Sequence, residues 1–188
     1  MDEQYAFWDY GKYVGLNEYE LSLVQENMEL MVYSILAFFV PFFLAQPQLI
    51  VGSIVNFALV LGALNMKGWK ILPVILLPSI GVLFAGVIFG GLTPSLVYMV
   101  PFIWAGNAIL VLSIKGLALW KKMNKALALV VGAILKSAFL FASAYVLFSF
   151  GIVPGALLAA MGILQIQTAL GGGFAALILH DEKRKFFA

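Results

Sequence analysis

The sequence predicts an all-α fold: a polytopic membrane protein built as a bundle of six transmembrane helices. Of its 188 residues, 63% are hydrophobic and only 11% are charged, whereas soluble domains carry about 25% charged residues. Long apolar runs recur along the chain, and a helix needs about 20 apolar residues to cross a bilayer. Because backbone groups in hydrocarbon must bond within their own segment, these runs should be helices.

The predicted spans are, in chain order, residues 28–45, 49–66, 71–90, 94–114, 126–150 and 155–179. They define a transmembrane domain over 28–180, followed by a charged tail over 181–188. Pro41 should kink the first span or loosen its last turn. Residues 115–125 are predicted to form a basic amphipathic linker.

An N-terminal segment, residues 1–27, precedes the first span and mixes aromatic residues with acids and glycines. Aromatic rings with a polar edge favour the headgroup zone of a bilayer. We therefore expect an interfacial segment. A helix over 17–27 and a loosely ordered tail are both compatible with its composition.

The basic residues predict the orientation in the membrane. They cluster after spans 2, 4 and 6, at Lys67, Lys70, Lys115, Lys121, Lys122, Lys125, Lys183, Arg184 and Lys185. The turns after spans 1, 3 and 5 carry none. Since loops rich in Lys and Arg stay in the cytoplasm, the pattern predicts a plasma-membrane protein whose N- and C-termini are both cytoplasmic.

The composition argues against most catalytic chemistry. There is no cysteine and a single histidine, His180, so a histidine-rich or thiolate metal site is excluded. No nucleophile, zinc or nucleotide motif is present. No predicted span holds a carboxylate at mid-depth, which argues against an autonomous proton-coupled antiporter. We expect no enzyme activity, no cofactor, no bound metal and no nucleic-acid partner.

Lys136 is the one charged residue well inside a predicted span. It lies about 15 Å from the cytoplasmic interface at 1.5 Å per residue, too far for one side chain to reach the interface by snorkelling unless the span begins later. We expect an interior lysine that meets an anionic ligand group or caps carbonyls freed by a proline in another span.

Uncharged polar residues also lie at membrane depth: Asn56, Asn107, Gln165 and Gln167. Each needs an interior partner, and for any single one a hydrogen bond between helices is the simplest role. Gln165 and Gln167 lie two positions apart, so they point to different faces of the helix. One of them is expected to face a cavity.

The stretch from Pro101 to Asn107 is the strongest candidate for a pocket. Pro101 frees a backbone carbonyl, Trp104 offers a stacking face, and Asn107 offers both a donor and an acceptor. Trp104 and Asn107 are three apart and share a helix face. The alternative is a kinked helix packed against its neighbours, with Trp104 on lipid.

Small residues predict close helix contacts. Gly86 and Gly90 form a G-x-x-x-G pair in span 3, and Gly155 and Ala159 form a similar pair in span 6. Further along span 6, the glycines at 171–173 allow either close approach or a break.

In size and topology the whole chain resembles the substrate-binding S-components of energy-coupling factor transporters. That family shows an A-x-x-x-A pattern in its first helix, and here the corresponding stretch runs from Ala37 to Ala45 with Pro41 in its middle. The resemblance implies a ligand-binding subunit for a vitamin or related micronutrient. It would work with a membrane partner subunit and separate ATPases. The proposed ligand-binding residues are Trp104, Asn107, Asn56, Gln165, Gln167 and Lys136. The competing hypothesis is a non-catalytic anchor or assembly subunit of a larger membrane complex.

Overall fold

A computed structural model describes residues 14–44, 47–86 and 93–187, and it contains six helical segments long and apolar enough to cross a membrane. No β-strand occurs in these ranges. The all-α, multi-pass membrane fold predicted from the sequence is confirmed. The helices, in chain order, are α2 (Leu23–Phe43), α3 (Gln48–Asn65), the short 3-10 turn η2 (Gly68–Ile71), α4 (Leu72–Ala85), α5 (Thr93–Ser113), the π-helical segment η4 (Ile114–Trp120), α6 (Lys125–Ser149), α7 (Ala156–Met161) and α8 (Ile163–Phe187).

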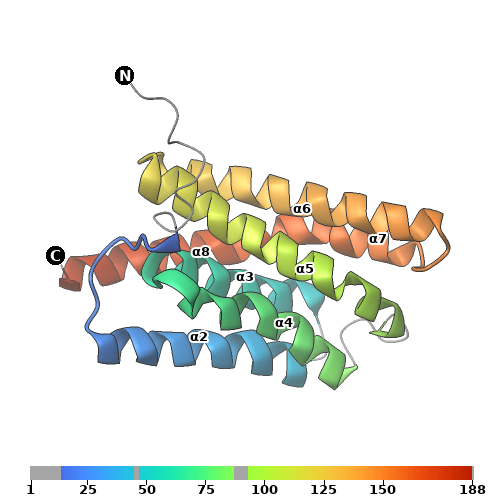
Figure 1. The fold of residues 1–188 in the computed structure, drawn as a ribbon, viewed down its shortest axis with the longest axis horizontal. Coiled ribbons are helices and arrows are strands. Elements are labelled where there is room, and N and C mark those ends of the chain that lie inside the picture. The colour runs from blue at the N-terminus through green and yellow to red at the C-terminus, as the bar shows by residue number, and fades with distance from the viewer. Residues whose placement is uncertain (1–13, 45–46, 87–92, 188) are drawn as a thin grey trace.

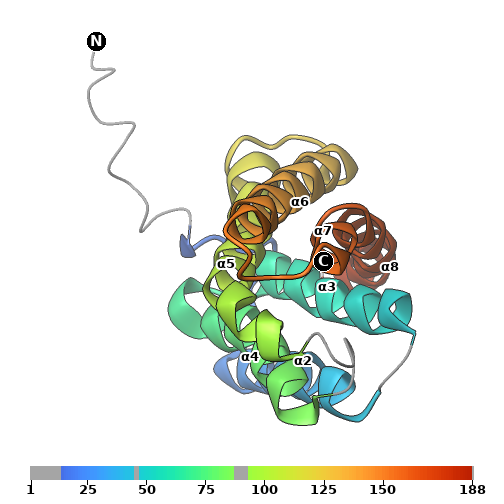
Figure 2. The ribbon, with the colours of Figure 1, turned by 90° about the vertical axis from the view of Figure 1, so that its right-hand side faces the viewer.

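The helices run along one axis and pack as neighbouring pairs (Figure 1). Seen end-on, α2 lies beside α4, α3 beside α8, and α5 beside α6 (Figure 2). One end of the bundle holds the start of α2, the α3–α4 connection, the η4–α6 connection and the end of α8. We call this the basic end, because the predicted basic clusters lie there. The opposite end holds the turn between α6 and α7.

Helix α2 begins earlier than predicted, at Leu23 instead of Met28, because Ser22 caps it. The Ser22 hydroxyl accepts a hydrogen bond from the Gln25 amide, and the Gln25 side chain accepts one from the Ser22 amide. This capping box satisfies two amides that would otherwise lack partners. Pro41 lies inside the helix, which ends two residues later at Phe43.

The segment before α2 is neither a helix from residue 17 nor a loose tail. Residues 15–22 are not helical, yet the Glu18 amide donates to the Leu64 carbonyl at 2.9 Å. Residues 1–13, which the interfacial prediction also covers, lie outside the described ranges.

The prediction of a linker from residue 115 was wrong, because the helix continues as η4 to Trp120 and Lys115 is fully buried. The Lys115 ammonium donates to the carbonyls of Leu16 and Met66 at 2.6 and 2.7 Å. Both carbonyls come from segments distant in sequence, so Lys115 ties the N-terminal segment to the end of α3.

The sixth span is interrupted at Gly162, where α7 ends and α8 begins. Helix α8 then continues to Phe187, so the predicted tail from residue 181 forms its last turns. The glycines at 171–173 do not break it. A Cβ atom at Gly172 would lie 1.9 Å from the Ser53 carbonyl oxygen, so this glycine allows α8 to press against α3.

Gly86, which the sequence predicts to pair with Gly90 inside span 3, is the residue that follows α4. It terminates α4 in the left-handed region at φ 65°, a conformation that glycine adopts without a steric penalty. Its predicted partner, Gly90, falls outside the described residues.

Candidate functional site

A cavity of about 90 Å³ lies within the bundle, bordered by residues from α2, α3, α4, α5, α6, α7 and α8. Its polar lining consists of Gln48, Asn56, Ser79, Asn107, Lys136 and Gln165. The remaining walls are apolar and are formed by valine, leucine, isoleucine, methionine, proline and glycine residues. A mostly apolar cavity with a few convergent polar groups is the usual form of a small-molecule site.

The cavity occupies the half of the bundle away from the basic end. Its lining includes Gln48, the first residue of α3, and Met161, the last residue of α7. Pro41 and Val82, near the last residues of α2 and α4, also border it. Lys136 lies about 16 Å along α6 from the basic end of that helix, at 1.5 Å per residue.

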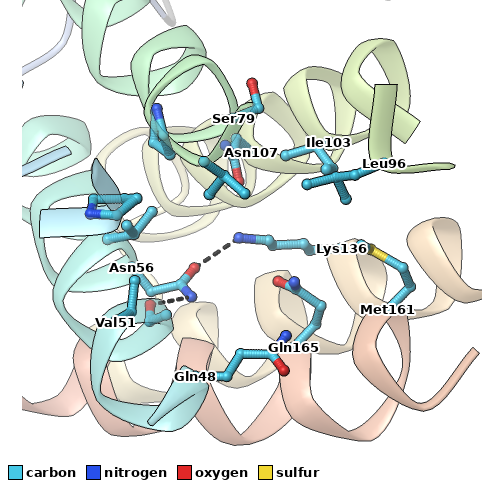
Figure 3. A pocket seen from close by; sticks show the side chains of 15 residues that line it. Gln48, Val51, Asn56, Ser79, Leu96, Ile103, Asn107, Lys136, Met161 and Gln165 are labelled. Carbon is cyan, nitrogen blue, oxygen red and sulfur yellow. Dashed lines mark hydrogen bonds between the residues drawn. The ribbon is translucent and has the colours of Figure 1, made fainter. Parts of the chain in front are cut away.

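Lys136 is only 2% exposed, which confirms the interior position expected for it. Its ammonium donates to Asn56 Oδ1 at 2.7 Å, across from α6 to α3 (Figure 3). A lysine ammonium has three donors, and among the described residues this is its single hydrogen bond. No carboxylate of the described chain forms an ion pair with it.

Asn56 is held in one orientation by its own contacts. Its amide nitrogen donates to the Gly52 carbonyl at 2.9 Å and to Thr168 Oγ1 at 3.2 Å. Since both hydrogens of the amide are used, the oxygen is turned toward Lys136. Asn56 was predicted to need an interior partner, and it has two on other helices: Thr168 on α8 and Lys136 on α6.

Trp104 and Asn107 reach from α5 to the backbone of α4 beside Pro78. Asn107 Nδ2 donates to the Ile75 carbonyl at 3.0 Å. Trp104 Nε1 lies 2.7 Å from Ser79 Oγ and 3.1 Å from the Leu76 carbonyl. These bonds join two helices at a proline-containing turn.

The two residues of this predicted pair differ in their position relative to the cavity. Asn107 borders the cavity, whereas Trp104 is not part of its lining. The carbonyls that receive these bonds belong to the turn around Pro78, in a different helix from Pro101.

The two glutamines of α8 also separate, as their spacing predicted. Gln165 lines the cavity, and Gln167 is exposed on the outer face of the bundle. Of the six proposed ligand-binding residues, the structure brings four to the cavity: Asn56, Asn107, Lys136 and Gln165.

Sequence reasoning missed two polar residues of the lining, Gln48 and Ser79. Gln48 lies just before the predicted start of the second span at residue 49, but it is the first residue of α3. Ser79 carried a usable signal, because it is a polar residue directly after a proline inside a span. Its hydroxyl bonds to the Leu76 carbonyl at 3.1 Å.

A second polar cluster lies at the basic end and is built around Glu18. This carboxylate pairs with Lys125 at 2.8 Å and Arg184 at 3.0 Å, and it lies 3.1 Å from His180 Nε2. Burial alone raises the pKa of the Glu18 carboxyl, but hydrogen bonds and charges from His180 and Lys125 outweigh it and lower the pKa to about 2. Glu18 thus fastens the N-terminal segment to α6 and α8.

Glu29 forms a neighbouring contact between α2, α3 and α8. It pairs with Lys183 and accepts a hydrogen bond from Asn65 Nδ2 at 2.8 Å. The carboxylates Glu18 and Glu29 therefore lie with basic partners at the basic end and do not border the cavity. Within the ranges that the structure describes, no group of three or more His, Cys, Asp or Glu residues could hold a metal ion.

No protein-family model, curated protein or solved structure matches the chain.

Proposed function

We propose that this protein is the membrane-embedded substrate-binding subunit of an uptake transporter for a small molecule, with a micronutrient as the ligand class. The observation that carries the proposal is the cavity around Lys136, where a buried lysine and several amide side chains converge inside an apolar bundle. Polar and ionisable groups are costly at membrane depth, and where they occur they commonly mark a substrate path.

The arrangement of the lining favours binding over simple helix packing. Gln48 and Gln165 make no side-chain hydrogen bond to another described residue, although both border the cavity. Both side chains are half-buried, so their amides remain free to donate or accept hydrogen bonds. A ligand with polar atoms would supply these bonds.

The orientation proposed for the chain suits uptake. If the basic end faces the cytoplasm, as the distribution of Lys and Arg favours, the cavity lies in the half nearer the outer face. A ligand arriving from outside would then reach the site before it met the apolar cluster near the basic end, which includes Leu59, Leu64 and Ile114.

The energy for transport would come from separate ATPase subunits, because the chain carries no nucleotide-binding motif. A membrane partner would connect them to this subunit. Ala37, the first residue of the stretch compared with the S-component motif, is fully buried. Partner docking would therefore use a surface other than that of Ala37.

The test is gentle purification from the native membrane, followed by mass spectrometry of the bound small molecules and the attached subunits. The proposal predicts one small molecule at close to equimolar amount, together with ATPase subunits. A ligand-free protein attached to a large non-transport complex would contradict it and support the anchor hypothesis instead.

A further inference from the structure

We propose that the ligand of this cavity is a small monocarboxylate with an apolar body, and that its carboxylate pairs with the ammonium of Lys136. The inference rests on the proposed binding function and specifies its substrate class. It comes from the charge and hydrogen bonds that the cavity leaves unmatched.

Lys136 has no counter-charge among the described residues. Lys136 is buried at membrane depth, and its hydrogen-bond partner Asn56 is neutral. The other buried lysine, Lys115, has two backbone carbonyls as acceptors. Lys136 has one acceptor among the described residues, so it keeps donors free for a ligand.

The ammonium of Lys136 is held in a fixed position. Asn56 is held by Gly52 and Thr168, and its oxygen holds the Lys136 side chain across the bundle. Figure 3 shows the lysine extended between the helices, with its nitrogen at Asn56. A preorganised cation of this kind binds an anion without first having to be ordered.

The amide of Gln165 lies near Lys136 and can also bond to a ligand. Gln165 reaches toward Lys136 in Figure 3, and its amide forms no side-chain hydrogen bond among the described residues. A carboxylate has two oxygens that accept hydrogen bonds. One oxygen can accept from Lys136, and the other can accept from the amide of Gln165.

The apolar walls and the volume of the cavity indicate what the rest of the ligand is like. Val82, Leu96, Ile103 and Met161 form apolar wall on the side toward the opposite end of the bundle. Among the residues that the structure describes, no second basic side chain lines the cavity. The volume of about 90 Å³ holds several water molecules, at roughly 10–15 Å³ for each. These features fit one carboxylate on a short apolar body and disfavour a polyanion.

The experiment compares carboxylates with their uncharged amides of nearly the same shape. Purified protein in lipid nanodiscs is titrated calorimetrically with butyrate, butyramide, benzoate and benzamide. We expect at least one of the carboxylates to bind at least tenfold more tightly than its amide. The preference should disappear in Lys136→Met and persist in Lys121→Met, which removes an exposed lysine at the basic end.

The outcomes separate this inference from the proposed function. Equal binding of an acid and its amide, or an unchanged preference in Lys136→Met, would overturn the inference and leave a binding function in place. Failure of all four probes also overturns it. The binding function then stands if a small molecule co-purifies, and falls if none does. Lys136→Gln, which can still bond to Asn56, provides a second variant if Lys136→Met does not fold.

Discussion

Lys136 on α6 and Asn56 on α3 are joined by a hydrogen bond of 2.7 Å between residues 80 positions apart in the chain. The bond brings the one interior lysine of the cavity to a neutral amide, with no carboxylate bound to either residue among the described ranges. The Lys136 nitrogen is held in place, and no described carboxylate pairs with it. A bound ligand would complete the site.

Removal of this charge should stabilise the ligand-free protein. Insertion scales assign a lysine at the centre of a membrane helix a cost of about 2.5–3.5 kcal/mol, while an acceptor left without a donor costs about 1–3 kcal/mol. We therefore expect Lys136→Met to raise the thermal unfolding midpoint in detergent by a few degrees, with Lys121→Met unchanged. A clear fall would mean that Lys136 serves mainly to hold α3 and α6 together.

Trp104 and Asn107 should have separable effects, although both bond to α4. Trp104→Phe removes the donor to Ser79 and Leu76 and should cost about 1 kcal/mol of stability. Ligand affinity should stay within a factor of about two, because Trp104 does not line the cavity. Asn107→Ala should lower stability and also weaken binding about tenfold.

Thermal unfolding and calorimetric titration of the two variants make this comparison. Loss of ligand binding in Trp104→Phe, at unchanged stability, would show that the indole contacts the ligand after all.

Acid should weaken the attachment of the N-terminal segment. The pKa of Glu18 is lowered from 4.5 to about 2 in the folded protein. Its ionised form therefore stabilises the fold above about pH 4.5, and this contribution is lost as the pH falls toward 2. Lys125, His180 and Arg184 are the groups that face Glu18.

Glu18→Gln should reduce stability at pH 7 by on the order of 1 kcal/mol. It should also flatten the loss of stability between about pH 4.5 and 2. Unfolding followed by intrinsic fluorescence over this range tests both expectations. Identical pH profiles for the variant and the wild-type protein would contradict the role assigned to Glu18.

The proposed orientation can be tested in cells because the chain contains no cysteine. Ser149 and Lys121 are exposed and lie at opposite ends of the bundle, so each can be replaced singly with cysteine. A membrane-impermeant maleimide should label the cysteine at position 149 in intact cells, and should label the one at 121 after lysis. Labelling of position 121 from outside would contradict the proposed orientation.

The helices were largely predictable because each depends on a local property, the length of an apolar run. Helix α6, predicted over 126–150, covers Lys125–Ser149. Errors arose where a contact distant in sequence overrides a local pattern. The local sequence around Lys115 is typical of a basic linker. In the folded protein the Lys115 ammonium is buried and donates to the carbonyls of Leu16 and Met66, which are distant in sequence.

The sequence indicated which residue types the candidate site contains, but not which of those residues contact each other. An interior lysine and an amide in an apolar helix both indicate a special role from sequence alone. That Lys136 meets Asn56, or that Trp104 turns to α4, depends on how the helices rotate against each other. Hydrophobic runs do not encode that rotation, because lipid-facing and core-facing residues are equally apolar.

The central claim is that the cavity around Lys136 holds a ligand, and filling the cavity tests it most directly. Val82 borders the cavity on α4, whereas Val97 on α5 is 53% exposed and does not border it. Val82→Phe and Val97→Phe therefore add the same ring inside and outside the site. The measurement is mass spectrometry of small molecules released from each purified protein. We predict the same equimolar ligand from the wild type and Val97→Phe, and none from Val82→Phe. Equal release from all three proteins, or no ligand from any, would contradict the account.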